Sequence, residues 1–352
     1  MSPEPLPPGA VLLHIGPYKT GTTAIQRSLH QHRADLAQHG VLYPGSSPRQ
    51  RKASWAAVGR SPRGAEPVAM EAWRRMLREV EEAGAQRVVV SSEDFTSAPP
   101  EAVRSIVEDL GGDRVHVVMV IRPLDRLLPS SWQQRVKSAR ETLTLDEWLR
   151  EVLESPGGWK GPTFWKNQGV DNLVERYAVV VPRDRITIIV SDESDRTQQM
   201  RTFESLLGLP TGLLTPGEHE NTSLSLDRTE LLRRVNLLAD ERGWSESSRR
   251  ALIHGGMLGD LRRTPPQPGE RLIPGLPAWA VDRVAELGHE RADQVRASGC
   301  HVVGDPAWLD APPRAADAAD LPEQVSLTLA AAAVAGVVDA VLRRESPDRK
   351  AP

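Results

Sequence analysis

Cysteine is almost absent from this chain, and so is any long hydrophobic segment. With Cys300 as its one cysteine, the chain can form no internal disulfide, and no cluster of thiols indicates a metal site. The longest apolar run, from Val325 to Val338, is shorter than the roughly 20 residues that a membrane-spanning helix needs. Residues 1–8 are rich in proline and lack the hydrophobic core of a secretion signal. We therefore expect a cytoplasmic protein that spans no membrane.

A strong charge of one sign is missing too. The chain has 44 Lys and Arg against 47 Asp and Glu, a formal net charge of −3, so no overall field attracts nucleic acid or a membrane surface. Hydrophobic residues make up 39% and charged residues 26%, as in ordinary globular proteins. The 352 residues can bury an ample core. The composition does not indicate an oligomeric state.

Apolar runs alternate with segments of helical periodicity. We expect strands at 11–15, 41–43, 87–91, 114–121 and 186–190, and helices at 22–38, 71–83, 101–110, within 124–177, and at 195–207, 226–241, 278–297 and 323–343. Continuously apolar strands are typical of parallel sheets that are covered on both faces. The pattern predicts an α/β fold, a doubly wound parallel sheet flanked by helices, with a largely helical C-terminal half. Residues 9–310 would form the main domain, followed at 311–352 by a Pro/Ala-rich connection and a helix that docks on one side of the sheet.

The most informative segment is Gly16-Pro-Tyr-Lys-Thr-Gly-Thr-Thr23, between the first strand and the first helix. A glycine loop at this place is a phosphate cradle, because its backbone N–H groups and the helix dipole both favour an anion. The two glycines have the spacing of the P-loop of nucleotide triphosphatases. However, Thr22 stands where that loop needs lysine, and Lys19 lies inside the turn. The sequence predicts a P-loop type of sheet whose triphosphate and magnesium apparatus is altered.

A second motif follows the strand at 114–121. Arg122 comes directly after this strand and Ser130 eight residues later, with Ser131 as an alternative. Open α/β sheets bind ligands at the carboxyl ends of their strands. Arginine offers a permanent two-point charge to a phosphate, and serine adds a hydroxyl donor. The pair therefore indicates a second phosphate contact.

Two carboxylates follow the strand at 87–91. Glu93 can accept the proton of an attacking group at this edge of the sheet. Two other interpretations stay open. Glu93 and Asp94 could hold magnesium, as the acidic strand end of an ATPase does, or they could cap the segment that follows.

The loop and the arginine–serine pair resemble the nucleotide-binding motifs of the sulfotransferases, most closely those of bacterial members that read His-Ile-Gly-Pro-x-Lys-Thr-Gly-Thr-Thr. These enzymes move a sulfuryl group from 3′-phosphoadenosine 5′-phosphosulfate (PAPS) to a hydroxyl or amine. The resemblance is clear over residues 11–140 and thinner afterwards. It implies PAPS as co-substrate, released as adenosine 3′,5′-bisphosphate, no metal requirement, and a small-molecule or carbohydrate acceptor.

The resemblance also implies roles for particular residues. Lys19 would neutralise the bridging oxygen, and Glu93 matches in type and position the catalytic glutamate of some carbohydrate sulfotransferases. The nucleotide contacts would come from Gly16, Pro17, Tyr18, Lys19, Thr20, Gly21, Thr22, Thr23, Arg122 and Ser130.

The chain departs from the family in two places. Ala24 stands where cytosolic members carry a tryptophan that can stack on adenine, and their late Arg-Lys-Gly loop is missing. Asn221 and Ser223 could supply the late nucleotide contacts instead, although Ser225 or Asp227 could simply cap the next helix.

Two other functions remain open from the sequence: a P-loop kinase or NTPase, and a non-catalytic nucleotide-binding module. The acceptor site is not defined by the sequence. The basic connection from Arg49 to Arg63 could recognise an anionic or sugar acceptor, but a solvated loop is the simpler interpretation.

Overall fold

The structure is a computed structural model that describes residues 3–61, 66–155, 158, 160–216, 223–313 and 321–345. It divides into two compact units, each built from separate parts of the chain. The first unit comprises Met1–Leu127, Gly157–Glu220 and Val284–Pro312, and the second comprises Leu128–Pro156, Asn221–Arg283 and Pro313–Pro352. The boundary predicted between residues 310 and 311 stays a prediction.

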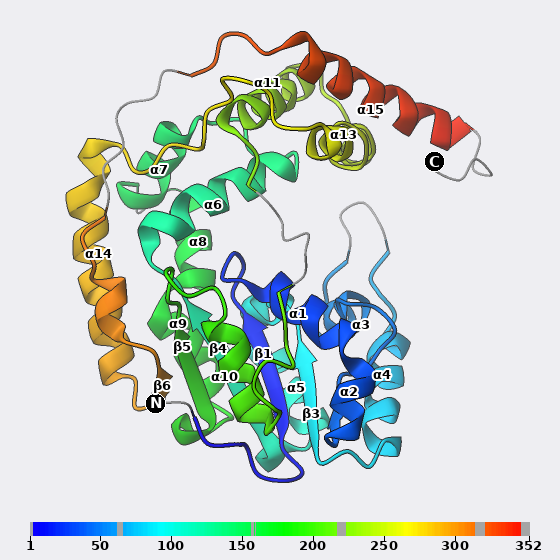
Figure 1. Cartoon of the computed structure of the whole chain (residues 1–352), viewed down its shortest axis with the longest axis vertical. Coiled ribbons are helices and arrows are strands. Elements are labelled where there is room, and N and C mark those ends of the chain that lie inside the picture. Colours follow the sequence, from blue (N-terminus) through cyan, green and yellow to red (C-terminus); the bar gives the residue numbers. More distant parts are fainter. Residues whose placement is uncertain are drawn as a thin grey trace. The chain divides into compact units, whose positions relative to one another are not determined.

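The first unit contains a parallel sheet of six strands in the order β2-β3-β1-β4-β5-β6 (Figure 1). The strands are β1 (Val11–Gly16), β2 (Val41–Leu42), β3 (Arg87–Ser91), β4 (Val115–Ile121), β5 (Ile186–Val190) and β6 (His301–Val303). The predicted α/β fold with a parallel sheet is therefore confirmed. The short edge strand β6 was not predicted.

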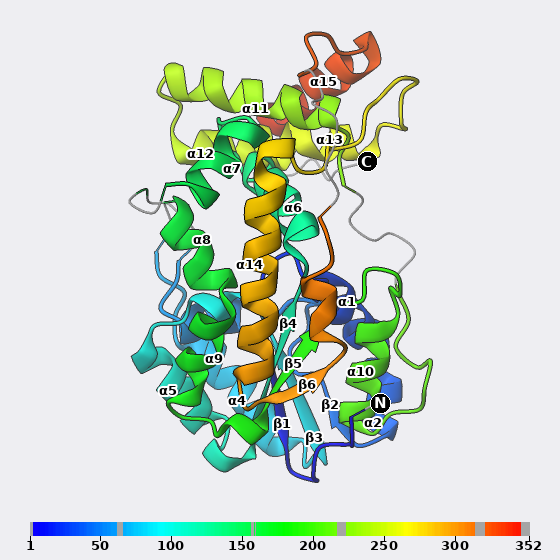
Figure 2. The same cartoon turned by 90° about the vertical axis from the view of Figure 1, so that its left-hand side faces the viewer.

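Helices cover both faces of this sheet, because its strands are apolar on both sides. Leu12 and Leu13 are successive buried residues of β1 that belong to different hydrophobic clusters, one on each face. The helices of this unit are α1 (Thr22–Gln31), α2 (Arg33–Gln38), α3 (Arg51–Ala57), α4 (Glu71–Glu82), α5 (Pro100–Asp109), α8 (Lys160–Gln168), α9 (Val170–Ala178), α10 (Gln198–Leu207) and most of α14 (Ala278–Ala297). Figure 2 shows α5 and α9 on one face of the sheet and α1 and α10 on the other.

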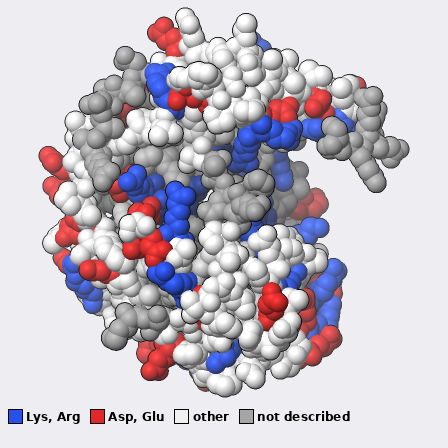
Figure 3. Space-filling model, viewed as in Figure 1, with Lys and Arg blue, Asp and Glu red and all other residues white. Residues whose placement is uncertain are grey.

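Short 3₁₀ segments connect these elements at η1 (Glu93–Ser97), η2 (Gly112–Arg114), η3 (Arg183–Arg185) and η5 (Pro306–Leu309). Acidic and basic side chains are interspersed over the face of the first unit that is visible in the lower half of Figure 3.

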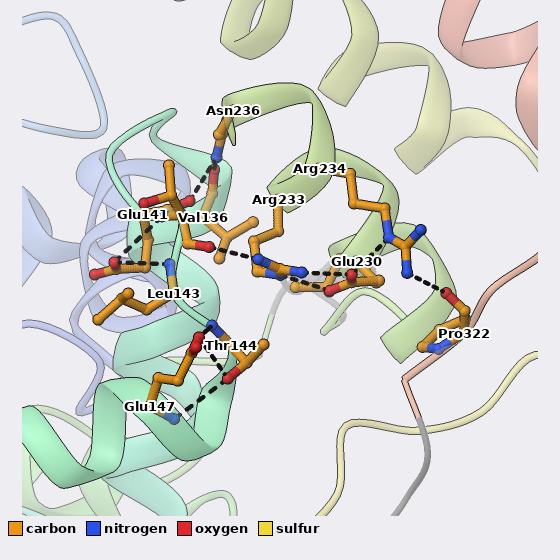
Figure 4. A network of polar contacts seen from close by, with 12 residues as sticks. Val136, Glu141, Leu143, Thr144, Glu147, Glu230, Arg233, Arg234, Asn236 and Pro322 are labelled. Carbon is orange, nitrogen blue, oxygen red and sulfur yellow. Dashed lines mark hydrogen bonds and ion pairs between the residues drawn. The ribbon is translucent and has the colours of Figure 1, made fainter. Parts of the chain in front are cut away.

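The second unit is helical in the residues that the structure describes. It contains most of α6 (Leu124–Lys137) together with α7 (Leu145–Leu153), α11 (Leu226–Glu241), α12 (Glu246–Arg249), the π-helical η4 (Arg250–Met257), α13 (Leu258–Arg263) and α15 (Leu327–Glu345). A polar network stabilises it (Figure 4): Glu230 accepts hydrogen bonds from Arg233 and Arg234, and Asn236 donates to the carbonyl of Val136. Burial works against ionisation, but the two arginines hold the pKa of Glu230 below its ordinary value.

The C-terminal helix α15 packs on η4 and α13 within the second unit, and its docking on the sheet stays a prediction. Small residues explain this contact. A Cβ atom on Gly256 would lie 2.4 Å from the carbonyl oxygen of Gly336, so the two backbones approach closely because both positions are glycine. Among the described residues, no helix combines the length and the apolar character needed to cross a membrane.

Candidate nucleotide and transfer site

The loop after β1 curves sharply around its own backbone. Three of its residues have positive φ, namely Gly16 (94°), Lys19 (70°) and Gly21 (95°). Lys19 is the unusual one, since side chains other than glycine rarely adopt this conformation. When right-handed and left-handed backbone conformations alternate, successive N–H groups point toward one place and form an anion-binding nest. The geometry is that of the phosphate cradle expected from the sequence.

The cradle leads into a helix N-terminus that has no side-chain cap. Gly21 is the N-cap of α1, and the first turn of α1 contains no acidic residue. An uncapped helix start leaves backbone donors and the positive end of the dipole available to an anion. Thr20 stabilises the turn from within, because its hydroxyl donates to the carbonyl of Pro17 at 2.7 Å. Thr23 accepts a hydrogen bond from Nη2 of Arg49 at 2.9 Å.

Glu93 lies against the start of this loop, since β3 is the direct neighbour of β1. A Cβ atom on Gly16 would lie 3.1 Å from both Cα and Cβ of Glu93, so glycine permits this approach. The Glu93 side chain is buried, and its Oε2 accepts a hydrogen bond from Nε2 of Gln26 at 3.1 Å. Gln26 belongs to α1, so the helix that follows the cradle also orients the carboxylate.

The cap of η1 is Ser92, whose hydroxyl accepts from the backbone N–H of Asp94 at 3.2 Å. Capping therefore does not account for the carboxylate of Glu93. The carboxylate of Asp94 is engaged elsewhere: Oδ1 accepts from the hydroxyl of Tyr18 and from Nη1 of Arg60, both at 2.5 Å. Burial and the charge of Asp94 raise the pKa of Tyr18, so this phenol stays protonated at neutral pH.

This Tyr18–Asp94–Arg60 cluster was not foreseen as a unit. The sequence placed Tyr18 in the cradle and Arg60 in a basic connection, and nothing in their spacing indicated a shared carboxylate. Among the residues that the structure describes, no group of three or more His, Cys, Asp or Glu side chains is arranged to hold a metal ion.

Arg122 lies beside the cradle, as expected from a strand that neighbours β1 on the other side. Its Nη1 donates to the carbonyl of Lys19 at 3.2 Å. The rest of its guanidinium forms a two-point ion pair with Glu193, at 2.7 and 2.6 Å. A 3′-phosphate would therefore have to replace Glu193 or bind beside it. No pattern in the sequence links Arg122 to Glu193, which is 71 positions away.

A buried arginine supports the same loop from α14. Arg291 is 3% exposed, and its Nη1 donates to the carbonyl of Arg122 at 2.8 Å. Its Nη2 reaches the carbonyl of Gln168, whose side chain donates to the carbonyl of Tyr18 at 3.0 Å. Burial lowers the pKa of Arg291 to about 10, so it remains charged at neutral pH. A basic residue within the otherwise small and apolar stripe of α14 was the one sequence signal for it.

The remaining predicted contacts are not brought together here. Ser130 lies on α6 and Ser223 is exposed, both in the second unit, so their relation to Arg122 stays a prediction. Asn221 lies outside the described residues. Ser225 caps α11 by accepting from the backbone N–H of Arg228 at 3.2 Å, as the capping interpretation proposed.

No model of a protein family matches the chain, and no curated protein matches it. Among solved structures, the chain is similar to a sulfotransferase from Alicyclobacillus acidocaldarius, with 21% identity, a TM-score of 0.42, and coverage of 69% of this chain and 95% of that chain.

Proposed function

We propose that this protein is a PAPS-dependent sulfotransferase that moves the sulfuryl group to a hydroxyl or amine of a small-molecule or carbohydrate acceptor. One observation carries the proposal. A phosphate cradle with Lys19 inside its turn packs its first glycine against Glu93, so an anion-binding loop, a cation and a carboxylate belong to one edge of the sheet.

Each of these groups has a task in sulfuryl transfer. The acceptor oxygen or nitrogen forms a bond to sulfur, and the bond from sulfur to the bridging oxygen breaks with its electron pair left on the 5′-phosphate. The cradle and the start of α1 bind that phosphate, and Lys19 neutralises the charge that grows on the bridging oxygen. Glu93 takes the proton of the acceptor. Such transfers pass through a loose transition state, so position and charge provide most of the rate.

The choice of nucleotide separates this function from its rivals. A kinase or NTPase is disfavoured by Thr22 at the position where the P-loop lysine belongs. By calorimetry, we expect adenosine 3′,5′-bisphosphate to bind at least about tenfold more tightly than ATP or ADP with magnesium, a difference of about 1.4 kcal/mol. Tighter binding of magnesium–ATP would overturn the proposal. Selective bisphosphate binding without transfer in a broad acceptor screen would favour a non-catalytic module.

Arg122 and Glu193 give a paired test of the 3′-phosphate contact. We expect Arg122→Ala to weaken the binding of adenosine 3′,5′-bisphosphate by roughly 2–3 kcal/mol, because a charge-assisted two-point contact is lost. Adenosine 5′-phosphate should be affected much less. The matched variant Glu193→Gln removes the carboxylate that competes for Arg122, and it should therefore bind the bisphosphate more tightly than the wild type. An equal loss for both nucleotides in Arg122→Ala would mean that Arg122 only supports the loop.

A further inference from the structure

Arg49 is held at the cradle by a hydrogen bond to α1, although the simpler interpretation of the sequence placed it in a solvated basic loop. Its Nη2 donates to the hydroxyl of Thr23, on the first turn of α1, at 2.9 Å. In the described part of the chain this is its one hydrogen bond, and no carboxylate lies within ion-pair distance of it. Arg60, from the same connection, is paired with Asp94.

The backbone around Arg49 is fixed by the sheet. The next residue, Gln50, is buried, and its Oε1 accepts from the backbone N–H of Ser91 at 2.8 Å while its Nε2 donates to the carbonyl of Pro44 at 2.9 Å. On the other side, the hydroxyl of Tyr43 donates to the carbonyl of Pro48 at 2.9 Å. Arg49 is therefore attached to the end of the strand that precedes Glu93, and it is not part of a freely solvated loop.

The surroundings of Arg49 are unusual for a cation. It lies at the positive end of α1, where a helix favours anions, and its one partner is a neutral hydroxyl. Burial and the charges of Arg51 and Arg27 lower its pKa, and only Glu93 and Asp94 act in the other direction. A guanidinium held at this place by a rigid backbone is stabilised when an anion binds between it and the cradle.

We propose that Arg49 is a further catalytic residue, whose guanidinium contacts the sulfuryl oxygens during transfer, between Thr23 of the cradle and Glu93. The proposal rests on the proposed function. Charge is spread over the sulfuryl oxygens as the bond to the bridging oxygen breaks and the bond to the acceptor forms. Arg49 stays protonated and stabilises this charge through planar, paired donors, as arginines do in phosphoryl transfer. Lys19 acts on the leaving oxygen and Glu93 on the acceptor proton, so the three roles are separate.

The test compares Arg49→Gln with Arg51→Gln. Arg51 is exposed on α3, where its guanidinium lies over the ring of Trp55, so its variant removes the same charge two positions away. We use PAPS labelled in the sulfuryl group and measure sulfate release when water is the acceptor, and labelled, sulfated product with any acceptor found in the screen. We expect Arg49→Gln to lower kcat about 100-fold, as loss of a preorganised donor does. Arg49→Lys should recover part of the lost kcat, and Arg51→Gln should have the kcat of the wild type.

Calorimetry with adenosine 3′,5′-bisphosphate completes the test, because this nucleotide has no sulfuryl group. In Arg49→Gln its affinity and the melting temperature should stay near wild type. Three results for Arg49→Gln would each overturn the catalytic role of Arg49. They are a normal kcat, a loss of bisphosphate affinity as large as the loss of kcat, and a raised acceptor KM at unchanged kcat. If Arg49→Gln is defective but the wild type transfers normally, the proposed function is unaffected. Wild-type protein that neither binds the bisphosphate nor releases sulfate would remove both proposals.

Discussion

Exchange of Glu93 for glutamine should remove most sulfuryl transfer and leave nucleotide binding intact. The glutamine amide fills the same space, and its oxygen can still accept the hydrogen bond that Gln26 donates to Oε2 at 3.1 Å. It cannot take a proton from the acceptor. General bases contribute roughly 100- to 10,000-fold, so we expect kcat to fall within this range while the melting temperature and bisphosphate affinity change little.

The neighbouring carboxylate is the matched control. Asp94→Asn removes a charge one position away, but this carboxylate is engaged with Tyr18 and Arg60. We expect it to lower stability more than kcat, because it breaks a half-buried cluster. A normal rate in Glu93→Gln with a large loss in Asp94→Asn would move the base to Asp94. A chelator should leave the wild-type rate unchanged, and loss of turnover on chelation would instead favour the metal-holding interpretation.

The strands show which parts of the fold were predictable. The strand at 87–91 and the strand at 186–190 were predicted with their observed bounds, because each contains three consecutive branched apolar residues that must be covered on both faces. The edge strand His301–Val303 has too few apolar residues to form such a pattern. The predicted helix 22–38 is two helices that meet at His32, where the backbone leaves helical geometry without a glycine or proline to signal it.

The candidate site also has a part that could be predicted from the sequence and a part that could not. The cradle is local in sequence, and so its loop could be recognised from the spacing of Gly16 and Gly21. The pairing of Arg122 with Glu193 and the hydrogen bond from Arg49 to Thr23 join distant segments. Such contacts depend on where the loops between strands and helices pass the edge of the sheet. The periodicity of a single sequence does not indicate the path of a loop. Arg49 was therefore the residue most easily dismissed as a solvated charge.

Exchange of Lys19 for alanine should lower turnover far more than nucleotide affinity. We expect a loss of kcat on the order of 100-fold or more, because the ammonium acts on the bridging oxygen, where charge grows as the bond breaks. The bisphosphate product should still bind within about tenfold of wild type, since the backbone of the cradle provides much of its phosphate contact.

The backbone at this position makes alanine a clean substitution. Lys19 has a φ of 70°, and alanine is strained there to a similar degree as lysine, so the variant removes the amine without a new conformational cost. Lys19→Gly would also relax the turn, and it should therefore lose more bisphosphate affinity than Lys19→Ala. Lys52→Ala removes an exposed amine from α3 and should behave as wild type. Near-normal turnover of Lys19→Ala at saturating PAPS would reject the role of Lys19, because a residue that stabilises the leaving oxygen cannot be removed without slowing the step in which that oxygen departs.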